Sequence, residues 1–383
     1  MAPLFSQWHL FDIPDHVAYF NTASNSPQLN ASRDRLHAGV AGKSRPWLRT
    51  SDDFFEDADT LRQLAAELFG GSADAYAIIP SASYGIATAA RALEPELGPG
   101  DRILVIEDIF PSNYLAWQRS AAETGAELTV VPTPEDGDWT TAVLDRLDAS
   151  VRVAALPHCH WTNGAFIDLV AVGRACRSLG ISLVVDATQS LGAMPMDMDE
   201  IRPDFLTAAG YKWLLAPYGL SLLYVDSGRQ DARPLEETWI ARDNARNFSE
   251  LVNYSSNYMA GARRFDVGET CVPTLLPGAI AALEQIRDWG VANIAETLAA
   301  VNGTIITCLE ELGFDLPPKA QRSPHMFGAG LPAHYQGDLV GELMARDIYI
   351  SRRGNALRFS PHLHVRPEDV ARLTSELTDL IRG

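Results

Sequence analysis

The sequence predicts an α/β fold in which helices cover both faces of a mostly parallel sheet. Short apolar runs alternate along the chain with segments of helical period, such as the amphipathic segment 169–179. The apolar run 181–185 ends in Asp186, and another run leads to Lys212, 26 residues later (212 − 186 = 26). A crossover of that length returns the chain to a neighbouring parallel strand, so both side chains can reach one crevice.

Composition limits the class of protein. The 383 residues, 46% apolar and 21% charged, are ordinary for a globular enzyme with two domains or with one large and one small domain. The formal net charge of −18 argues against nucleic acids and anionic membranes as partners. The four cysteines lie far apart, which is typical of reduced thiols: Cys159, Cys176, Cys271 and Cys308.

Targeting signals are not apparent in the sequence. The chain begins without a basic region followed by an apolar stretch, and we expect no apolar run to span a membrane. These observations predict a soluble, cytoplasmic protein.

The first third of the chain contains a candidate anion site. Residues 19–27 indicate an extended segment entering a loop, and a helix over 57–69 ends at two glycines. A strand over 76–79 is followed by a turn of small residues, 80–85, and by a helix to Leu93. Such a turn presents free backbone N–H groups to an anion, and the hydroxyls of Ser81 and Ser83 could assist. A helix with a serine cap is the alternative.

The middle of the chain continues the alternation of strands and helices. The aromatic Phe110, just past the strand 102–106, could cover a flat ring or belong to the core. His158, Cys159 and His160 suggest a metal site, but their spacing is too tight for a tetrahedral set, so we predict no metal. The other expected elements are strands over 128–131, 151–156 and 220–225, and helices over 141–147, 277–289 and 292–313.

Lys212 is the strongest candidate for catalysis. It lies in an apolar stretch that contains Gly210, and a buried ammonium is costly unless it is neutralised or bonded. One use for such a lysine is as an amine of lowered pKa that forms a Schiff base, and the alternative is a strand-end lysine that reaches solvent. The acid Asp186 favours the first interpretation. Together they fit a pyridoxal phosphate site, where lysine carries the cofactor and the acid keeps its pyridine nitrogen protonated.

The segments 185–190 (VDATQS) and 210–214 (GYKWL) resemble the class V aminotransferase family of pyridoxal phosphate enzymes. That family includes cysteine desulfurases, kynureninases and isopenicillin N epimerase-like proteins. The resemblance extends over nearly the whole chain, from residues 19–23 to 358–362. It implies fold-type I, with a mostly parallel seven-stranded sheet and a smaller C-terminal α+β domain. The implied parts are an N-terminal segment lining the active site (1–25), a large cofactor-binding domain (26–265) and a small domain (266–383).

The resemblance also implies how the cofactor is held. Ala82 and Ser83 match the phosphate loop, and Phe110 matches the aromatic that stacks on the pyridine ring. Gln189 would hydrogen-bond the phenolic oxygen, although it could instead cap a helix end. Tyr211 would donate to the phosphate, whereas Ala209 lacks the hydroxyl that desulfurases have at its position.

Substrate and partner contacts follow from the same resemblance. Arg358 would bind the α-carboxylate of a small amino acid, because a guanidinium matches a carboxylate in shape. Ala23, Ser24 and Trp161 are further candidates for substrate contact, with Trp161 standing where many relatives have asparagine. The family's contact with the phosphate in the neighbouring subunit predicts a homodimer with a shared active site. Here Glu269 comes first in that stretch and would repel a phosphate, so either Thr270 makes the contact or the contact is lost.

The sequence leaves several types of reaction open. We expect an aminotransferase of class V type, with a lyase or hydrolase (kynureninase-like or cleaving C–S bonds) or an epimerase as alternatives. Residues 321–331 and 350–355 contain no cysteine that could accept sulfur, which argues against a persulfide-forming desulfurase. A non-catalytic binding module is opposed by the presence of Lys212, Asp186 and Arg358 together.

Overall fold

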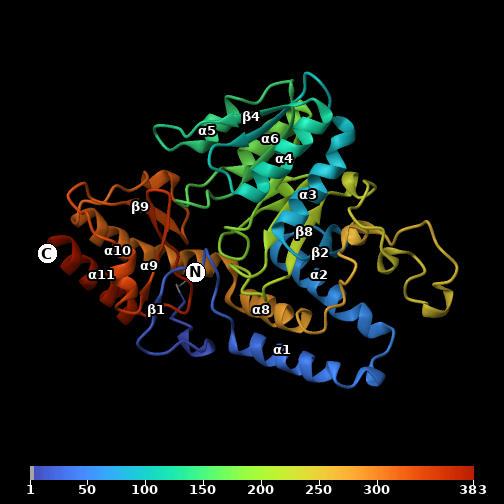
Figure 1. The fold of residues 1–383 in the computed structure, drawn as a ribbon, viewed down its shortest axis with the longest axis horizontal. Helices are drawn as coiled ribbons and strands as arrows, with labels where there is room; N and C mark the ends of the chain where they lie inside the picture. Colours follow the sequence, from blue (N-terminus) through green and yellow to red (C-terminus); the bar gives the residue numbers. More distant parts are fainter. Residues whose placement is uncertain (1–3) are drawn as a thin grey trace.

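The computed structural model describes residues 4–383 and has a seven-stranded sheet at its centre (Figure 1). Five adjacent strands, β7, β6, β5, β3 and β4, are parallel to one another. Strand β8 pairs antiparallel with both β7 and β2. The mostly parallel seven-stranded sheet is therefore confirmed. In spatial order its strands are β2 (Tyr76–Ile79), β8 (Ser221–Val225), β7 (Phe205–Ala209), β6 (Ser182–Asp186), β5 (Val151–Pro157), β3 (Arg102–Ile106) and β4 (Glu127–Val131).

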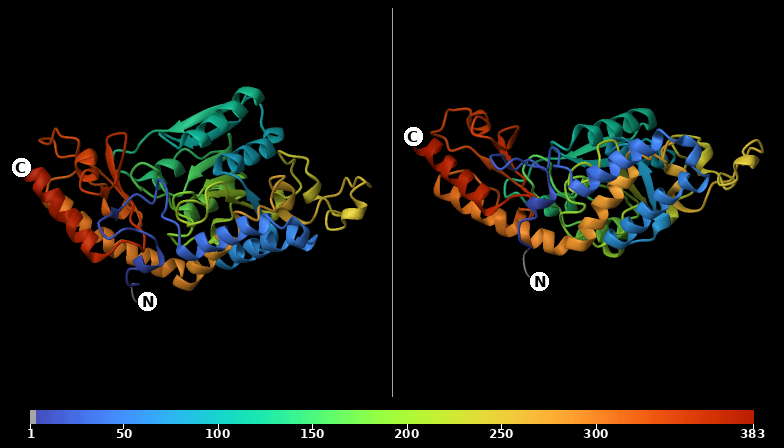
Figure 2. Two further views of the ribbon diagram at one scale, coloured as in Figure 1. Left: turned by 60° about the horizontal axis from the view of Figure 1, so that its bottom comes forward. Right: turned by 90° about the horizontal axis from the view of Figure 1, so that it is seen from below.

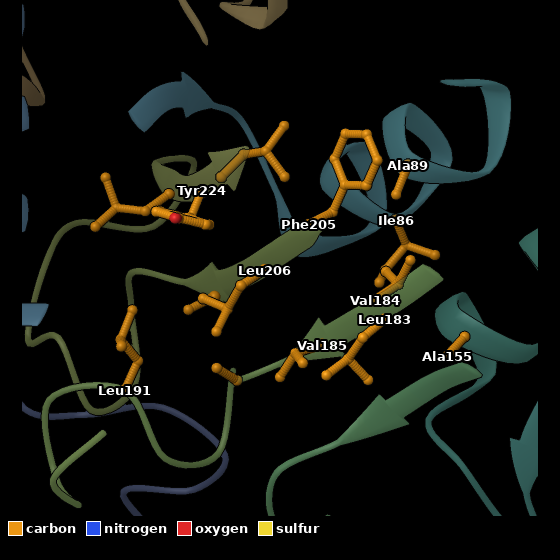
Figure 3. Packing of buried hydrophobic residues seen from close by; sticks show 14 of the residues in the cluster. Ile86, Ala89, Ala155, Leu183, Val184, Val185, Leu191, Phe205, Leu206 and Tyr224 are labelled. Atoms are coloured by element: carbon orange, nitrogen blue, oxygen red, sulfur yellow. The ribbon is translucent and has the colours of Figure 1, made fainter. Parts of the chain in front are cut away.

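Helices connect and cover these strands. Those of the large domain are α1 (Asn30–Lys43), α2 (Glu56–Phe69), α3 (Ala82–Leu93), α4 (Pro111–Thr124), α5 (Trp139–Leu144), α6 (Leu169–Leu179), α7 (Met198–Ile201) and α8 (Leu276–Trp289). Figure 3 shows Phe205 of β7 beside Ile86 and Ala89 of α3, where apolar side chains on both elements are buried. Helix α5 begins before the predicted residue 141, because the Asp138 carboxylate accepts a hydrogen bond from the Thr141 amide.

A smaller lobe follows in the sequence, drawn in orange and red in Figure 1. It contains a three-stranded sheet, β11-β12-β9, and a parallel pair, β1-β10, that ties the N-terminal segment to this lobe. Its elements are β1 (Ala18–Tyr19), α9 (Val291–Glu311), β9 (Phe327–Gly330), α10 (Leu339–Met344), β10 (Ile348–Tyr349), β11 (Ser351–Arg353), β12 (Ala356–Phe359) and α11 (Pro367–Arg382). Strands β11 and β12 form an antiparallel hairpin, whereas Ile348 and Tyr349 pair with β1.

The two lobes have separate apolar cores. Leu276, Ile280 and Leu283 of α8 belong to the core of the large sheet, whereas the second core combines Phe20 with residues from Ile305 onward. The packing therefore changes within α9, later in the chain than the 265/266 boundary expected from the sequence.

Helix α9 differs from the expectation that no apolar run could span a membrane. Its 21 residues are long and apolar enough to do so by length and composition alone. The buried helix of a folded core passes the same test. Ile294 and Leu298 pack near Trp213, and Ile305 and Leu309 pack in the second core. Figure 2 shows this helix (orange) extending from the large lobe into the C-terminal lobe, so it joins the two cores.

Residues 226–265, called the arm below, contain short 3-10 helices at Ser227–Arg229, Trp239–Ala241, Phe248–Glu250 and Gly261–Phe265. Figure 1 shows the arm (yellow) reaching away from the sheet.

Gly85 provides a test of the packing between α3 and β7. A Cβ at this position would lie 2.8 Å from Thr207 Cβ and 2.9 Å from Ile79 Cδ1, whereas a Cβ at Gly303 in α9 would meet nothing within 4 Å. We expect Gly85→Ala to lower the free energy of unfolding by about 1–3 kcal/mol through overpacking. Gly303→Ala, the control, should raise it by up to about 1 kcal/mol through helix propensity. Chemical denaturation measures both, and equal effects would contradict the close approach.

Candidate active site

A cavity lies where loops leave the carboxyl ends of the sheet strands, as expected for a ligand site in an α/β fold. The loops that follow β2, β3, β5, β6 and β7 all contribute to its wall. Its lining includes these predicted residues: Ala82, Ser83, Phe110, Trp161, Asp186, Gln189, Tyr211 and Lys212. Side chains from five separate segments thus line one cavity.

Lys212 projects into this cavity from the turn after β7. Its side chain is buried, and among residues 4–383 no carboxylate lies within ion-pair distance of Nζ, which lies 5.7 Å from the ring centroids of both Phe110 and Tyr211. Burial lowers the pKa of the amine to about 8, an effect that Asp186 opposes and that Arg358 and Arg353 strengthen. The amine is therefore partly unprotonated near neutral pH, which suits a nucleophile or a base.

Asp186 ends β6 beneath the same cavity. One carboxylate oxygen accepts a hydrogen bond from the Thr188 amide at 3.0 Å, and the other remains free for a ligand. Burial raises the pKa of Asp186, while the hydrogen bonds from Thr188 and the charge of Lys212 lower it. An opposite charge on a bound ring nitrogen would favour the carboxylate further.

The first turn of α3 forms another wall. The Ser81 hydroxyl accepts a hydrogen bond from the Tyr84 amide and lies 2.9 Å from the Ser83 hydroxyl. The amides of Ala82 and Ser83 are in the first helical turn, where N–H groups have no acceptor within the helix. The serine cap is therefore present, and it leaves the amides of Ala82 and Ser83 without an acceptor in the helix, so that a phosphate contact there stays a prediction.

Phe110 and Trp161 form an aromatic pair at the cavity. Their ring centroids are 5.4 Å apart at an interplanar angle of 87°, and Trp161 Nε1 donates to the Asp108 carbonyl at 2.7 Å. Asp108 has a φ of 52°, which turns the chain sharply after β3 and places Phe110 at the start of α4. With 39% of its surface exposed, Phe110 presents its ring to the cavity and is not a plain core residue.

Both the nitrogen and the oxygen of the Gln189 side-chain amide form hydrogen bonds. Its Nε2 donates to the Ala23 carbonyl at 3.1 Å, and its Oε1 accepts from Trp213 Nε1 at 2.9 Å. One N–H therefore remains for the predicted contact with a cofactor oxygen. The Ala23 side chain is buried with Trp213 in an apolar cluster and does not line the cavity, so it cannot make the predicted substrate contact.

Tyr211 lines the cavity and packs against Tyr218, with ring centroids 4.3 Å apart. Thr270 lies outside it: the buried hydroxyl donates to the Val267 carbonyl. Within one chain Thr270 therefore cannot touch a ligand at Lys212.

Arg358 and Ser24 lie beside the cavity and not in its wall. Arg358 is 1% exposed and donates to the Ser24 hydroxyl at 2.7 Å and to the Trp161 carbonyl at 2.7 Å. All its hydrogen-bond acceptors among the described residues are neutral, and its pKa is lowered to about 9 by burial and by Arg353. A buried guanidinium without a counterion is suited to an anionic ligand.

The histidines near Cys159 are both buried. His160 stacks on Trp139 with ring centroids 5.6 Å apart and hydrogen-bonds to Thr162, while burial lowers the pKa of His158 to about 3. Within residues 4–383 no group of three potential ligands is close enough to hold a metal ion.

Sequence reasoning missed several residues at the site. Thr188 orients Asp186 and accepts from the Ala209 amide at 3.1 Å, Tyr218 packs on Tyr211, and Arg353 donates to Ser24 at 2.8 Å. The two-residue spacing from Asp186 could have indicated Thr188. The period of two along β11 could have indicated Arg353, but only with the hairpin register known.

This fold and this site define an enzyme that depends on pyridoxal phosphate. The chain belongs to the family described as aminotransferase class-V, whose family model matches residues 24–371. It is 25% identical over 324 residues to an uncharacterized aminotransferase of Bacillus subtilis, covering 84% of this chain and 83% of that protein. It is also 25% identical over 357 residues to a cysteine desulfurase of Serratia proteamaculans, covering 90% and 84%.

Solved structures share the fold. The cystine C-S lyase C-DES, in complex with its product cysteine persulfide, superposes with a TM-score of 0.86 over 96% of this chain and 98% of that chain at 19% identity. At that identity the similarity concerns the fold, and it confirms the fold-type I architecture predicted from the sequence.

The residues present fit the cofactor. The unpaired amine of Lys212, the free oxygen of Asp186 and the two free amides of α3 match its aldehyde, ring nitrogen and phosphate. When bound, pyridoxal phosphate supplies an electron sink for charge that develops at the substrate Cα.

The lowered pKa of Lys212 predicts how cofactor attachment depends on pH. Only the unprotonated amine can attack, so the attachment rate to the apoprotein should rise about tenfold per pH unit and level off above about pH 8. Nα-acetyl-lysine serves as the control. Its rate of attachment to the cofactor should level off only above about pH 10. The developing visible absorbance measures both rates. A protein profile that continued rising to pH 10 would contradict the lowered pKa, and Lys212→Ala should abolish attachment.

Proposed function

We propose that this protein is an aminotransferase acting on a small α-amino acid. The observation that carries the proposal is the position of Arg358, buried without a counterion and near enough to Lys212 for its charge to lower the pKa of that amine. An amino acid whose carboxylate binds Arg358 can present its Cα to Lys212. Substrate orientation and proton transfer are thereby assigned to different residues.

The proposed steps use groups already in place. Arg358 would bind the α-carboxylate of the substrate, and Lys212 would be the residue that holds the cofactor. The Lys212 amine would also accept the proton from Cα, for which its pKa of about 8 is suited near neutral pH. Asp186, fixed by the Thr188 amide, keeps its negative charge against the ring nitrogen. Phe110 and Trp161 cover the site and limit the access of water.

The cysteines support this reaction over persulfide formation. Cys159 is the cysteine in the cavity wall; it is 1% exposed, and burial raises the pKa of its thiol to about 12. Such a thiol stays protonated and is a poor nucleophile. The hairpin β11–β12, which lies above the site, has no cysteine. The B. subtilis relative is named an aminotransferase, and the match covers 83% of that protein.

A lyase that releases sulfur or another β-substituent directly is the second candidate. It is favoured by the relatives named cysteine desulfurase, one of which matches 90% of this chain. Removal of the Cα proton by Lys212 is common to both reactions. The two reactions differ in their products, because transamination yields a 2-oxo acid and the lyase reaction releases a β-substituent.

Product analysis distinguishes the two candidates. With a panel of amino acids, we expect one 2-oxo acid and one pyridoxamine phosphate per site, without ammonia or sulfide, because transamination leaves the amino group on the cofactor. Arg358→Met should reduce kcat/KM by about 10- to 100-fold, since a charge-assisted hydrogen bond contributes about 1.5–3 kcal/mol. Release of ammonia or sulfide without pyridoxamine phosphate would overturn the aminotransferase and support the lyase.

We also propose a homodimer in which Thr270 serves the site of the other subunit. Its absence from its own cavity is consistent with that role. Large apolar side chains are exposed near the end of α1 and on the arm, and such surfaces commonly become interfaces. They include Val40, Trp47, Leu48, Phe248, Val252 and Tyr254.

Subunit mixing tests the shared site. Lys212→Ala and Thr270→Val should each be impaired as separate preparations. After unfolding and refolding together, hybrid dimers should contain one intact site each, giving about a quarter of wild-type activity with random pairing. Recovery should be absent if Thr270 acts only within its own chain. Sedimentation of the wild-type protein as a monomer would also contradict the proposal.

A further inference from the structure

The hairpin β11–β12 directs two arginines to the same side. Ser351 pairs with Arg358 across the hairpin and Arg353 pairs with Ala356, so Ser351, Arg353 and Arg358 share one face. Arg352, which lies between Ser351 and Arg353 in the sequence, is on the opposite face and is exposed. Its Nε donates to the Gly354 carbonyl.

Both guanidinium groups on this face converge on one hydroxyl. Ser24 Oγ accepts from Arg353 at 2.8 Å and from Arg358 at 2.7 Å, and it donates to Asn21 Oδ1 at 2.8 Å. The remaining acceptors are the Arg352 and Trp161 carbonyls and the Ser351 hydroxyl. Across residues 4–383 neither arginine forms an ion pair, whereas most other buried or half-buried arginines do.

The charges at this place do not balance. Two guanidinium groups share a neutral hydroxyl, and the charge of Arg353 adds to burial in lowering the pKa of Arg358. Arg358 donates to the carbonyl of Trp161, a residue that lines the cavity together with Lys212, and both arginine charges lower the pKa of that amine. One α-carboxylate supplies a single negative charge, so one positive charge would remain next to the substrate.

We propose that Arg353 binds a second carboxylate, so that the substrate is a short α-amino dicarboxylic acid held by Arg358 at its α-carboxylate and by Arg353 at its side chain. This rests on the proposed function, which supplies the role of Arg358. The two donating nitrogens contact the same oxygen, so the sum of two hydrogen-bond lengths limits their separation. The ligand carboxylates must therefore be close, as they are in amino acids the size of aspartate or glutamate. The ligand would displace the contacts that Ser24 now makes with both arginines.

Binding of unreactive acids to the cofactor-loaded enzyme tests the proposal without turnover. Calorimetry would compare succinate with butyrate, and glutarate with valerate, since each pair has equal length and differs in one carboxylate. We expect one dicarboxylate to bind about tenfold or more tightly than its monocarboxylate partner, as for one additional charge-assisted contact. Arg353→Met should remove this difference and leave monocarboxylate binding within about twofold.

Two further variants serve as controls. Arg352→Met removes a charge one residue away on the opposite face and should keep the preference for dicarboxylates. Arg358→Met should weaken both kinds of acid. The proposal is overturned if the wild-type enzyme binds both kinds equally. It is also overturned if Arg353→Met weakens them equally, because both arginines would then share one carboxylate.

The product analysis described above is independent of this result. A preference for dicarboxylates that depends on Arg353, together with ammonia release, would retain the substrate class and reject the aminotransferase. Pyridoxamine phosphate formed from alanine as efficiently as from aspartate and glutamate would retain the aminotransferase and reject the role of Arg353.

Discussion

The buried amine of Lys212 is the constraint on which the rest of the site depends. An ammonium at this depth would normally need a counterion, yet among residues 4–383 no carboxylate, Asp186 included, lies within ion-pair distance of the Lys212 amine. Two guanidinium groups disfavour the charged lysine further. Because Lys212 has no carboxylate counterion, its amine stays reactive at a cost to the stability of the fold. A bound ligand would restore that stability.

The sheet explains how this arrangement is maintained. Asp186 ends β6, and the crossover through α7 leads to the parallel strand β7, whose last residue, Ala209, donates its amide to Thr188. Trp213 is then fixed through its indole to Gln189. Backbone and side chain hydrogen bonds on both sides of Lys212 thus leave its side chain few positions. This rigidity serves proton transfer, because the amine must meet Cα at a defined distance.

The sequence could predict the parts of this site that are local. Asp186 and Lys212 follow apolar strands, and strand ends meet at one edge of a parallel sheet. Contacts between distant segments could not be predicted in the same way. Ala23 has a small side chain like its neighbours, yet packing against Trp213 turns it away from the cavity. Arg353 differs from Arg352 only in strand phase, which depends on a register that the hairpin and β9 fix together.

The N-terminal segment couples the two lobes through the same residues that bind substrate in our proposal. Its strand β1 pairs with β10, and Ala23 and Ser24 contact Gln189 on one side and both arginines on the other. A ligand that draws Arg353 and Arg358 away from Ser24 would also loosen this segment from the small lobe. Ser24 therefore links the N-terminal segment to both arginines of the hairpin, and its hydroxyl is the group that a carboxylate would replace in our proposal.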